Sequence, residues 1–250
     1  MSDAGGTRCV ALVGPYLSGK TTLMESLLFA TGAIPRKGSV KEGNSVGDSS
    51  PEARGRQMST ELSVAYTEYL GDDWAFVDCP GSVELTQESY NALQAADVAV
   101  IVCEPAVERA VALAPLFRFL QDKKIPHMVF INKMDTASQT VQMVLEALQG
   151  GSSWPLVLRH LPIADGEDIT GYVDLVSERA YKYKPGEASD LISIPDSMTD
   201  DEHLARQVLL ESLADFDDDL LEQLLEDAIP PTGEVYEQLT KDLRDGLIIP

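Results

Sequence analysis

Residues 14–21 read Gly-Pro-Tyr-Leu-Ser-Gly-Lys-Thr, and this spacing constrains the chain more than any other feature of the sequence. An apolar, β-branched run at Arg8–Val13 precedes it, and Thr21–Ala30 continues with leucines at helical spacing. A glycine loop between a strand and a helix wraps phosphate groups with backbone N–H groups, while lysine neutralises phosphate oxygens and threonine binds Mg²⁺. We therefore predict a phosphate-binding loop made of Gly14, Pro15, Tyr16, Leu17, Ser18, Gly19, Lys20, Thr21 and Thr22.

A second candidate segment, residues 78–81, follows a predicted strand at Trp74–Val77. The strand would deliver the carboxylate of Asp78 to the phosphate loop, where an aspartate holds Mg²⁺ through water. Gly81 would let a backbone N–H approach the terminal phosphate. Taken alone, the segment is a Pro-Gly turn after a strand. Its place after the glycine loop favours the functional interpretation.

The third segment, residues 132–135, reads Asn-Lys-Met-Asp and follows an apolar run at His127–Ile131. A fixed Asp135 carboxylate can accept two hydrogen bonds from guanine N1–H and N2–H₂, a donor pair that adenine lacks. Unmatched buried polar groups are costly, so this discrimination can be large. We expect Lys133 to lie along the base and Asn132 to tie its loop to the phosphate loop. The three segments together predict binding of GTP or GDP with Mg²⁺.

Strand-like and helical stretches alternate through the first 149 residues. The runs Val98–Cys103 and His127–Ile131 are almost continuously apolar, as in parallel strands buried on both faces. Helices are expected at Thr86–Ala96, Val107–Gln121 and Ala137–Leu148. The pattern predicts an α/β fold, a P-loop NTPase domain of three layers around a parallel sheet, with ligand loops at the strand ends.

Between the first helix and the second strand lies a long segment, Thr31–Ser59, without hydrophobic period. It is rich in glycine, serine and charge, and we expect a mobile, functional loop. After it, Leu62–Leu70 and Trp74–Val77 form a predicted hairpin whose turn is at residues 71–73.

The character of the chain changes at the linker at residues 150–153. Short antiparallel strands are expected at Leu156–Ile163, Gly171–Val176 and Arg179–Lys184. Residues 199–202 have the form of a capping box before an amphipathic helix, and a second helix is expected at Asp219–Ala228. We expect the predicted helix face to be Leu204, Val208, Leu213 and Phe216. The predicted division is a nucleotide-binding domain at 1–149, an inserted α+β subdomain at 150–245, and the start of a returning strand at 246–250.

Charge is spread unevenly along the chain. The net charge of −22 divides into −6 for residues 1–150, with 18 acids and 12 bases, and −16 for residues 151–250, with 23 acids and 7 bases. The second part is so acidic that it would repel the phosphate backbone of a nucleic acid. It is better suited to bind a basic protein surface. Solubility alone is the competing explanation. Three cysteines without metal-ligand spacing, and no long apolar segment, favour a cytoplasmic protein without membrane insertion.

These segments resemble the GTPase domain of translational elongation factor G and its paralogues. The resemblance extends to residues 155–163 and 171–176, which look like the start of that factor's insertion subdomain. It implies ribosome binding and, in the first switch loop, a metal ligand and γ-phosphate sensor at Ser59, with Thr60 as the alternative. Thr21 and Asp78 complete the implied metal set. In the family the insertion precedes the final sheet strand, so the resemblance implies that later parts follow Pro250.

The sequence departs from this family at the reacting centre. Ser82 replaces the usual histidine that positions the attacking water, and Pro15 and Leu17 replace the usual histidine and aspartate of the phosphate loop. The implied catalytic residues are therefore Lys20, Gly81 and Ser82, which stands in the place of the usual histidine. Water-orienting and charge-stabilising groups are worth several powers of ten in GTP hydrolysis.

Two hypotheses follow for the function. The first is a ribosome-associated GTPase, and the second is a GTP-dependent ribosome-binding module with little hydrolysis. An adenine-specific ATPase is disfavoured by Asp135. We expect a monomer, and a basic ribosomal protein as the partner of the acidic residues 200–228. His127, His160 and His203 are expected to be structural.

Overall fold

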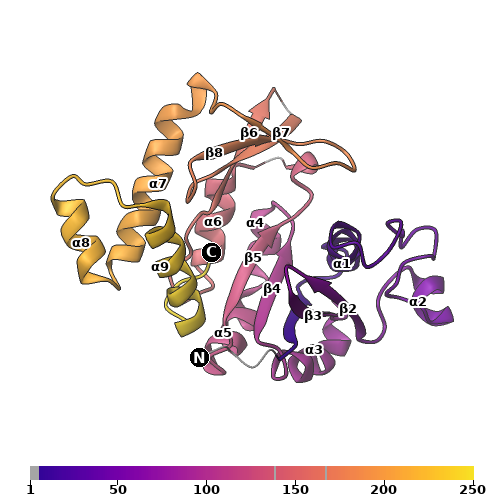
Figure 1. The fold of residues 1–250 in the computed structure, drawn as a ribbon. Coiled ribbons are helices and arrows are strands. Elements are labelled where there is room, and N and C mark those ends of the chain that lie inside the picture. Colours follow the sequence, from indigo (N-terminus) through magenta and orange to yellow (C-terminus); the bar gives the residue numbers. More distant parts are fainter. Residues whose placement is uncertain (1–5, 138, 167) are drawn as a thin grey trace.

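The computed structural model describes residues 6–137, 139–166 and 168–250, and its first sheet has five strands in the order β2-β3-β1-β4-β5. Four strands run parallel, and β2 pairs antiparallel with β3 at the edge. The strands are β1 Arg8–Val13, β2 Ser63–Tyr69, β3 Asp72–Asp78, β4 Val98–Cys103 and β5 His127–Ile131. The predicted α/β fold with a parallel sheet is confirmed (Figure 1).

Helices cover both faces of this sheet, because side chains of a buried strand alternate between two cores. In β1, Val10 and Leu12 pack with Met24 and Leu28 of α1, whereas Ala11 packs in the core on the opposite face. That opposite core is formed with α3, α4, α5 and α6. The helices of this part are α1 Lys20–Ala30, α2 Pro51–Arg56, α3 Thr86–Leu93, α4 Val107–Val111, α5 Ala114–Asp122 and α6 Val141–Gln149.

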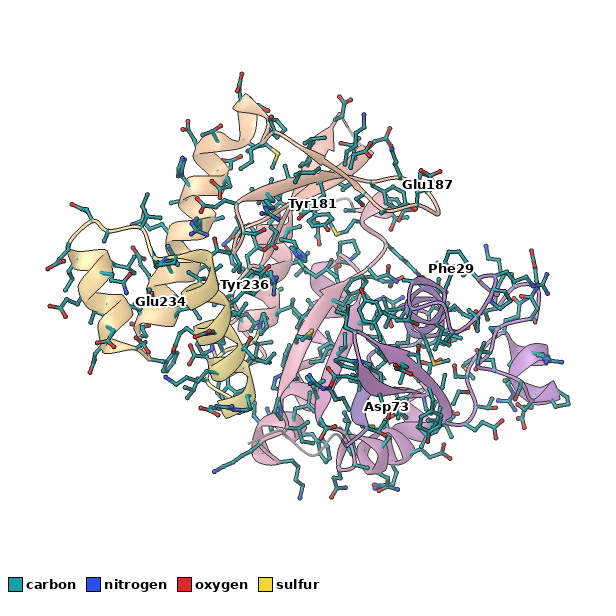
Figure 2. All side chains as sticks on the ribbon, in the orientation of Figure 1. Phe29, Asp73, Tyr181, Glu187, Glu234 and Tyr236 are labelled. Atoms are coloured by element: carbon teal, nitrogen blue, oxygen red, sulfur yellow. The ribbon has the colours of Figure 1, made fainter. Side chains whose placement is uncertain are left out.

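The second sheet is antiparallel, in the order β6-β7-β8-β9, and packs with three helices that lie on the opposite side of the first sheet from α1 and α2 (Figure 1). Tyr236 of α9, labelled in Figure 2, donates a hydrogen bond of 3.0 Å to Asp174 at the end of β7. The elements are β6 His160–Asp165, β7 Asp168–Asp174, β8 Arg179–Lys182, β9 Asp190–Ile192, α7 Thr199–Ala214, α8 Asp218–Leu225 and α9 Thr232–Asp245.

The last residues return to the first sheet. The amide of Val129 in β5 donates to the carbonyl of Pro250 at 2.9 Å. Ile249 forms an isolated parallel bridge with Leu156, and its side chain is buried in the core of the first sheet. These contacts accord with a returning strand at 246–250, and the division at 149/150 and 245/246 remains a prediction.

Several predicted element boundaries were wrong for local reasons. The expected helix at 107–121 is two helices, because Pro115 lacks an N–H and occupies the first turn of α5. The helix expected from Ala137 begins at Val141, where the Thr140 hydroxyl accepts from the amide of Met143 at 3.3 Å; Ser138 lies outside the described residues. The hairpin turns at Leu70 and Gly71, both with positive φ, and not at 71–73.

The capping box predicted at residues 199–202 was wrong. Thr199 is the first residue of α7, no side chain caps this helix, and Glu202 is buried. Of the predicted helix face, Leu213 is buried but Leu204, Val208 and Phe216 are exposed. The helix instead buries Arg206, Leu209, Leu210 and Leu213. Arg206 is held inside because its guanidinium donates to the carbonyls of Leu175 and Val176.

Some elements of the structure were not predicted from the sequence. They are α2, β9, α9 and three short 3₁₀ turns, η1 Val83–Leu85, η2 Met134–Thr136 and η3 Asp196–Met198. Within the described part of the chain, no helix has the length and apolarity needed to cross a bilayer.

Candidate nucleotide-binding site

The predicted phosphate-binding loop has a backbone conformation with positive φ angles, which glycine adopts readily. Gly14 and Gly19 have φ of 138° and 98°, and Leu17 between them has φ of 62°. A Cβ at Gly14 would lie 2.2 Å from the carbonyl oxygen of Val102 in β4. The loop therefore packs directly on the neighbouring strand before α1 begins at Lys20.

Lys20 is folded into this loop. Its side chain is buried, and Nζ donates to the carbonyls of Gly14 at 3.1 Å and Pro15 at 2.9 Å. Burial lowers the pKa of Lys20, and the nearby Asp78 carboxylate opposes that effect. A buried ammonium held at the centre of a phosphate-binding loop is placed to neutralise polyphosphate charge.

Thr21, Ser59 and Asp78 come together although they are distant in the sequence. The hydroxyl of Thr21 donates to Oδ2 of Asp78 at 2.5 Å and lies 3.3 Å from Oγ of Ser59. Burial raises the pKa of Asp78 to about 6, despite the hydrogen bond from Thr21 and the charge of Lys20. Thr60, the alternative to Ser59, is only half-buried.

This cluster has the chemistry of a Mg²⁺ site. Its donors are hydroxyl and carboxylate oxygens, which are the hard ligands that Mg²⁺ takes. Oδ1 of Asp78 is buried and has no hydrogen-bond partner in the described residues, so one carboxylate oxygen is available to a ligand or its water. No group of three or more His, Cys, Asp or Glu side chains in that part of the chain could hold a metal ion.

Gly81 lies against the phosphate-binding loop. A Cβ at this position would lie 2.5 Å from Nζ of Lys20 and 2.7 Å from the amide nitrogen of Tyr16. Only glycine brings the backbone this close to the lysine. Ser82 follows as the residue before η1, and its side chain makes no capping hydrogen bond. A hydroxyl stands at the position where the resemblance implied an imidazole.

Residues 132–135, which we predicted to recognise the base and name the base-recognition segment, are attached to the phosphate-binding loop. Nδ2 of Asn132 donates to the carbonyl of Ser18 at 2.9 Å, and a Cβ at Gly19 would lie 2.3 Å from that nitrogen. Nζ of Lys133 lies 2.6 Å from Oε1 of Glu104, and the backbone of Lys133 has a φ of 58°. Asp135 is exposed on η2, where its carboxylate is accessible to a ligand.

A cavity of about 610 Å³ joins these parts and falls within the usual size of small-molecule sites. Nine predicted site residues line it: Tyr16, Leu17, Gly19, Lys20, Thr21, Thr22, Ser59, Gly81 and Lys133. The remaining predicted residues lie outside its lining: Gly14, Pro15, Ser18, Asp78, Ser82, Asn132 and Asp135. A smaller cavity, about 280 Å³, lies at the second sheet and shares no lining residue with the first.

Three acidic residues at this site were not predicted. Asp48 lines the cavity, is buried, and has an Oδ1 without a partner among the described residues. Glu25 is buried under the long loop, and Glu104 pairs with Lys133. Glu104 directly follows β4, and a polar residue at a strand end was the available signal for it. Asp48 and Glu25 carried no pattern that marked them.

Comparisons with known proteins found related sequences and a related structure. The family of the elongation factor Tu GTP binding domain matches residues 6–226. An elongation factor G-like protein of Synechocystis sp. is 54% identical over 243 residues, covering 97% of this chain and 36% of that protein. Elongation factor G 2 of Photobacterium profundum is 28% identical over 260 residues, covering 100% of this chain and 36% of the relative.

A solved structure shares the fold. The crystal structure of a Thermus thermophilus protein matches with a TM-score of 0.88 and 31% identity, over 98% of this chain and 36% of the other. The chain thus spans 36% of the length of each of these relatives.

Proposed function

The chain belongs to the family of the elongation factor Tu GTP binding domain, and from that premise we propose that it binds GTP or GDP with Mg²⁺ in an elongation-factor-G-like translation factor. One observation carries the proposal. Lys20, Thr21, Ser59 and Gly81, from three separate segments, line a single cavity, and Asn132 ties residues 132–135 to the phosphate-binding loop.

Each part of the site has a role in this function. The backbone N–H groups of Gly14 and residues 16–19, together with the ammonium of Lys20, bind the polyphosphate. Thr21 and Ser59 would hold Mg²⁺ directly and Asp78 through water, and the ion would neutralise charge on the β- and γ-phosphate oxygens. Asp135 would select guanine by accepting from N1–H and N2–H₂, with Lys133 along the base.

We propose that hydrolysis is slow in the isolated domain. Lys20 and the backbone of Gly81 are placed to stabilise charge on the γ-phosphate, but Ser82 offers no imidazole to orient water. Leu17 offers no carboxylate near the β/γ bridge. We therefore expect the domain to bind GTP but to hydrolyse it slowly, because it has the groups for nucleotide recognition and lacks a group that orients water.

The second candidate is a GTP-dependent ribosome-binding module. In that case GTP orders the segments around Ser59 and Gly81, which both line the cavity, and the bound state decays slowly. The two candidates share the binding site and differ in turnover.

We propose the ribosome as partner, reached in the cytoplasm by a monomer, and the acidic helices as one contact surface. Leu204 and Val208 of α7 are exposed beside Asp200, Asp201 and Glu211. An apolar strip flanked by carboxylates suits a basic protein surface better than RNA. Charge reversal of the three acidic residues to lysine should weaken ribosome binding, and unchanged binding by a folded variant would argue against this surface.

Phosphate release by the natural full-length protein, with and without ribosomes, separates the two candidates. We expect slow phosphate release in the absence of ribosomes. Stimulation of about a hundredfold or more by ribosomes would establish the enzyme and rule out the binding module. Nucleotide-dependent ribosome binding with stimulation below about twofold would favour the module.

A further inference from the structure

Glu25 is a buried carboxylate on α1, one turn after the predicted metal ligand Thr21. Its side chain is almost inaccessible, with 1% of the residue exposed. Oε2 accepts a hydrogen bond from the amide of Gly38 at 2.7 Å, and Oε1 accepts one from the amide of Val46. Both oxygens of the carboxylate therefore accept hydrogen bonds from the backbone of the long loop, one at Gly38 and one at Val46.

Between these two attachment points the loop closes on itself. The amide of Ser39 donates to Oδ1 of Asn44 at 2.7 Å, and the amide of Asn44 donates back to the carbonyl of Ser39 at 3.3 Å. The amide of Gly43 donates to the carbonyl of Val40 at 3.1 Å. Residues 38–46 are thus a compact unit, which we name the anchored loop.

The anchored loop is tightly seated at Gly38. A Cβ there would lie 2.6 Å from the carbonyl oxygen of Asn44 and 2.9 Å from Oε2 of Glu25. One residue beyond the loop, a Cβ at Gly47 would lie 3.1 Å from Met24 and 3.4 Å from Thr21. The segment therefore runs back along α1 toward the metal cluster.

The anchored loop supplies a wall of the nucleotide cavity. Gly38, Ser39, Val40 and Lys41 line it, together with Lys37 immediately before the loop. Five cationic residues and one carboxylate line the cavity of a chain with net charge −22. They are Lys20, Lys37, Lys41, Arg56, Lys133 and Asp48. A cationic cavity in so acidic a chain concentrates anions.

We propose that Glu25 is a positioning residue that seats the anchored loop, so that Lys37 and Lys41 supply positive charge to the polyphosphate. The inference rests on the proposed function and adds to it a residue that acts without touching the nucleotide. The carboxylate suits this role because it accepts from two N–H groups. The amide of glutamine would present a donor to one of them, which leaves a buried N–H unpaired.

The first test is limited trypsin digestion of Glu25→Gln, with GDP and Mg²⁺ present. Glu68→Gln removes the same charge from an exposed position on β2 and serves as the matched control. We expect cleavage after Lys37 and Lys41 to be roughly tenfold faster in Glu25→Gln, because a loop that loses its attachment opens more often. The control should stay within about twofold of the wild type.

The second test asks whether Glu25 acts through the two lysines. Glu25→Gln and the double variant Lys37→Ala/Lys41→Ala should each weaken GDP binding by about tenfold, measured by calorimetry. In the double-variant background, Glu25→Gln should add less than about twofold, since the loop no longer carries the charges. Additive losses would overturn the proposed route through the lysines.

Gly38→Ala keeps Glu25 and disturbs the packing of the anchored loop against it from the loop side. It therefore tests the same claim if Glu25→Gln fails to fold. It should speed cleavage and weaken GDP binding in the same way. If both folded variants bind GDP as tightly as the wild type and are cleaved at the same rate, the inference is overturned and the proposed function stands. If the wild-type protein itself binds neither GTP nor GDP, both are overturned.

Discussion

Asn132 and Ser18 are 114 residues apart in the chain, and Nδ2 of Asn132 donates to the carbonyl of Ser18 at 2.9 Å. This hydrogen bond joins the end of β5 to the phosphate-binding loop. Gly19 permits the contact, because any Cβ there would lie 2.3 Å from the same nitrogen. The segment proposed to read the base and the segment proposed to bind phosphate are therefore joined directly by this hydrogen bond.

Asn132→Ala should weaken binding of GTP and GDP and lower the free energy of unfolding by about 1 kcal/mol, since the carbonyl of Ser18 loses its partner. Calorimetry and urea unfolding measure the two effects. Asn91→Ala on the exposed face of α3 is the control, and it should leave nucleotide affinity unchanged. Equal affinities for Asn132→Ala and the wild type would contradict the role of the contact.

Gly81→Ala should reduce nucleotide affinity by roughly tenfold or more, because its methyl group would displace Lys20, whose Nζ lies 2.5 Å from the Cβ position. Gly233→Ala in α9 meets no neighbour within 4 Å and is the matched control. Fluorescent GDP titration of both variants checks the prediction. A Gly81→Ala variant that binds as well as the control would show that the approach to Lys20 is dispensable.

The buried carboxyl group of Asp78 makes the stability of the protein depend on pH. Burial raises its pKa from 3.8 to about 6, so in the nucleotide-free protein its stabilising protonated form is lost as the pH rises through about 6. Asparagine cannot ionise. The stability of Asp78→Asn relative to the wild type should therefore increase between pH 4 and 6.5, by at most about 2–3 kcal/mol.

Urea unfolding across that range, without Mg²⁺, measures the effect. Addition of Mg²⁺ and GDP should reverse the order at pH 7, since a charged Asp78 is the form that serves the metal. Parallel stability profiles for the two proteins would contradict the assigned burial effect.

Ser82→His tests the origin of slow hydrolysis. An imidazole at this position should raise the ribosome-stimulated rate of phosphate release by roughly tenfold or more, with GDP affinity within about twofold of wild type. Ser82→Ala is the matched control and should match the wild type. If Ser82→His and Ser82→Ala release phosphate equally fast, the serine is not what limits turnover.

Much of the first sheet could be predicted from the sequence. The bounds of β1, β4 and β5 agree with the apolar runs, because a strand buried on both faces leaves a continuous hydrophobic signal. The meeting of Thr21 with Asp78 followed from the order of motifs along a parallel sheet. The outcome was poorer for α7, because the buried Arg206 breaks the hydrophobic period that prediction relies on.

The anchored loop shows what sequence reasoning could not reach. Glu25 binds amides 13 and 21 residues away, and such contacts use backbone groups that every residue carries. No residue type in 38–46 indicates from the sequence that these contacts form. Asp48 likewise reaches the cavity from a segment without hydrophobic period.

Competitive displacement of labelled GDP by GTP and by ATP measures whether the site selects guanine nucleotides. GTP should compete at concentrations at least about a hundredfold lower than ATP, because only guanine offers N1–H and N2–H₂ to Asp135. Equal competition by ATP and GTP would contradict the selection of guanine by Asp135.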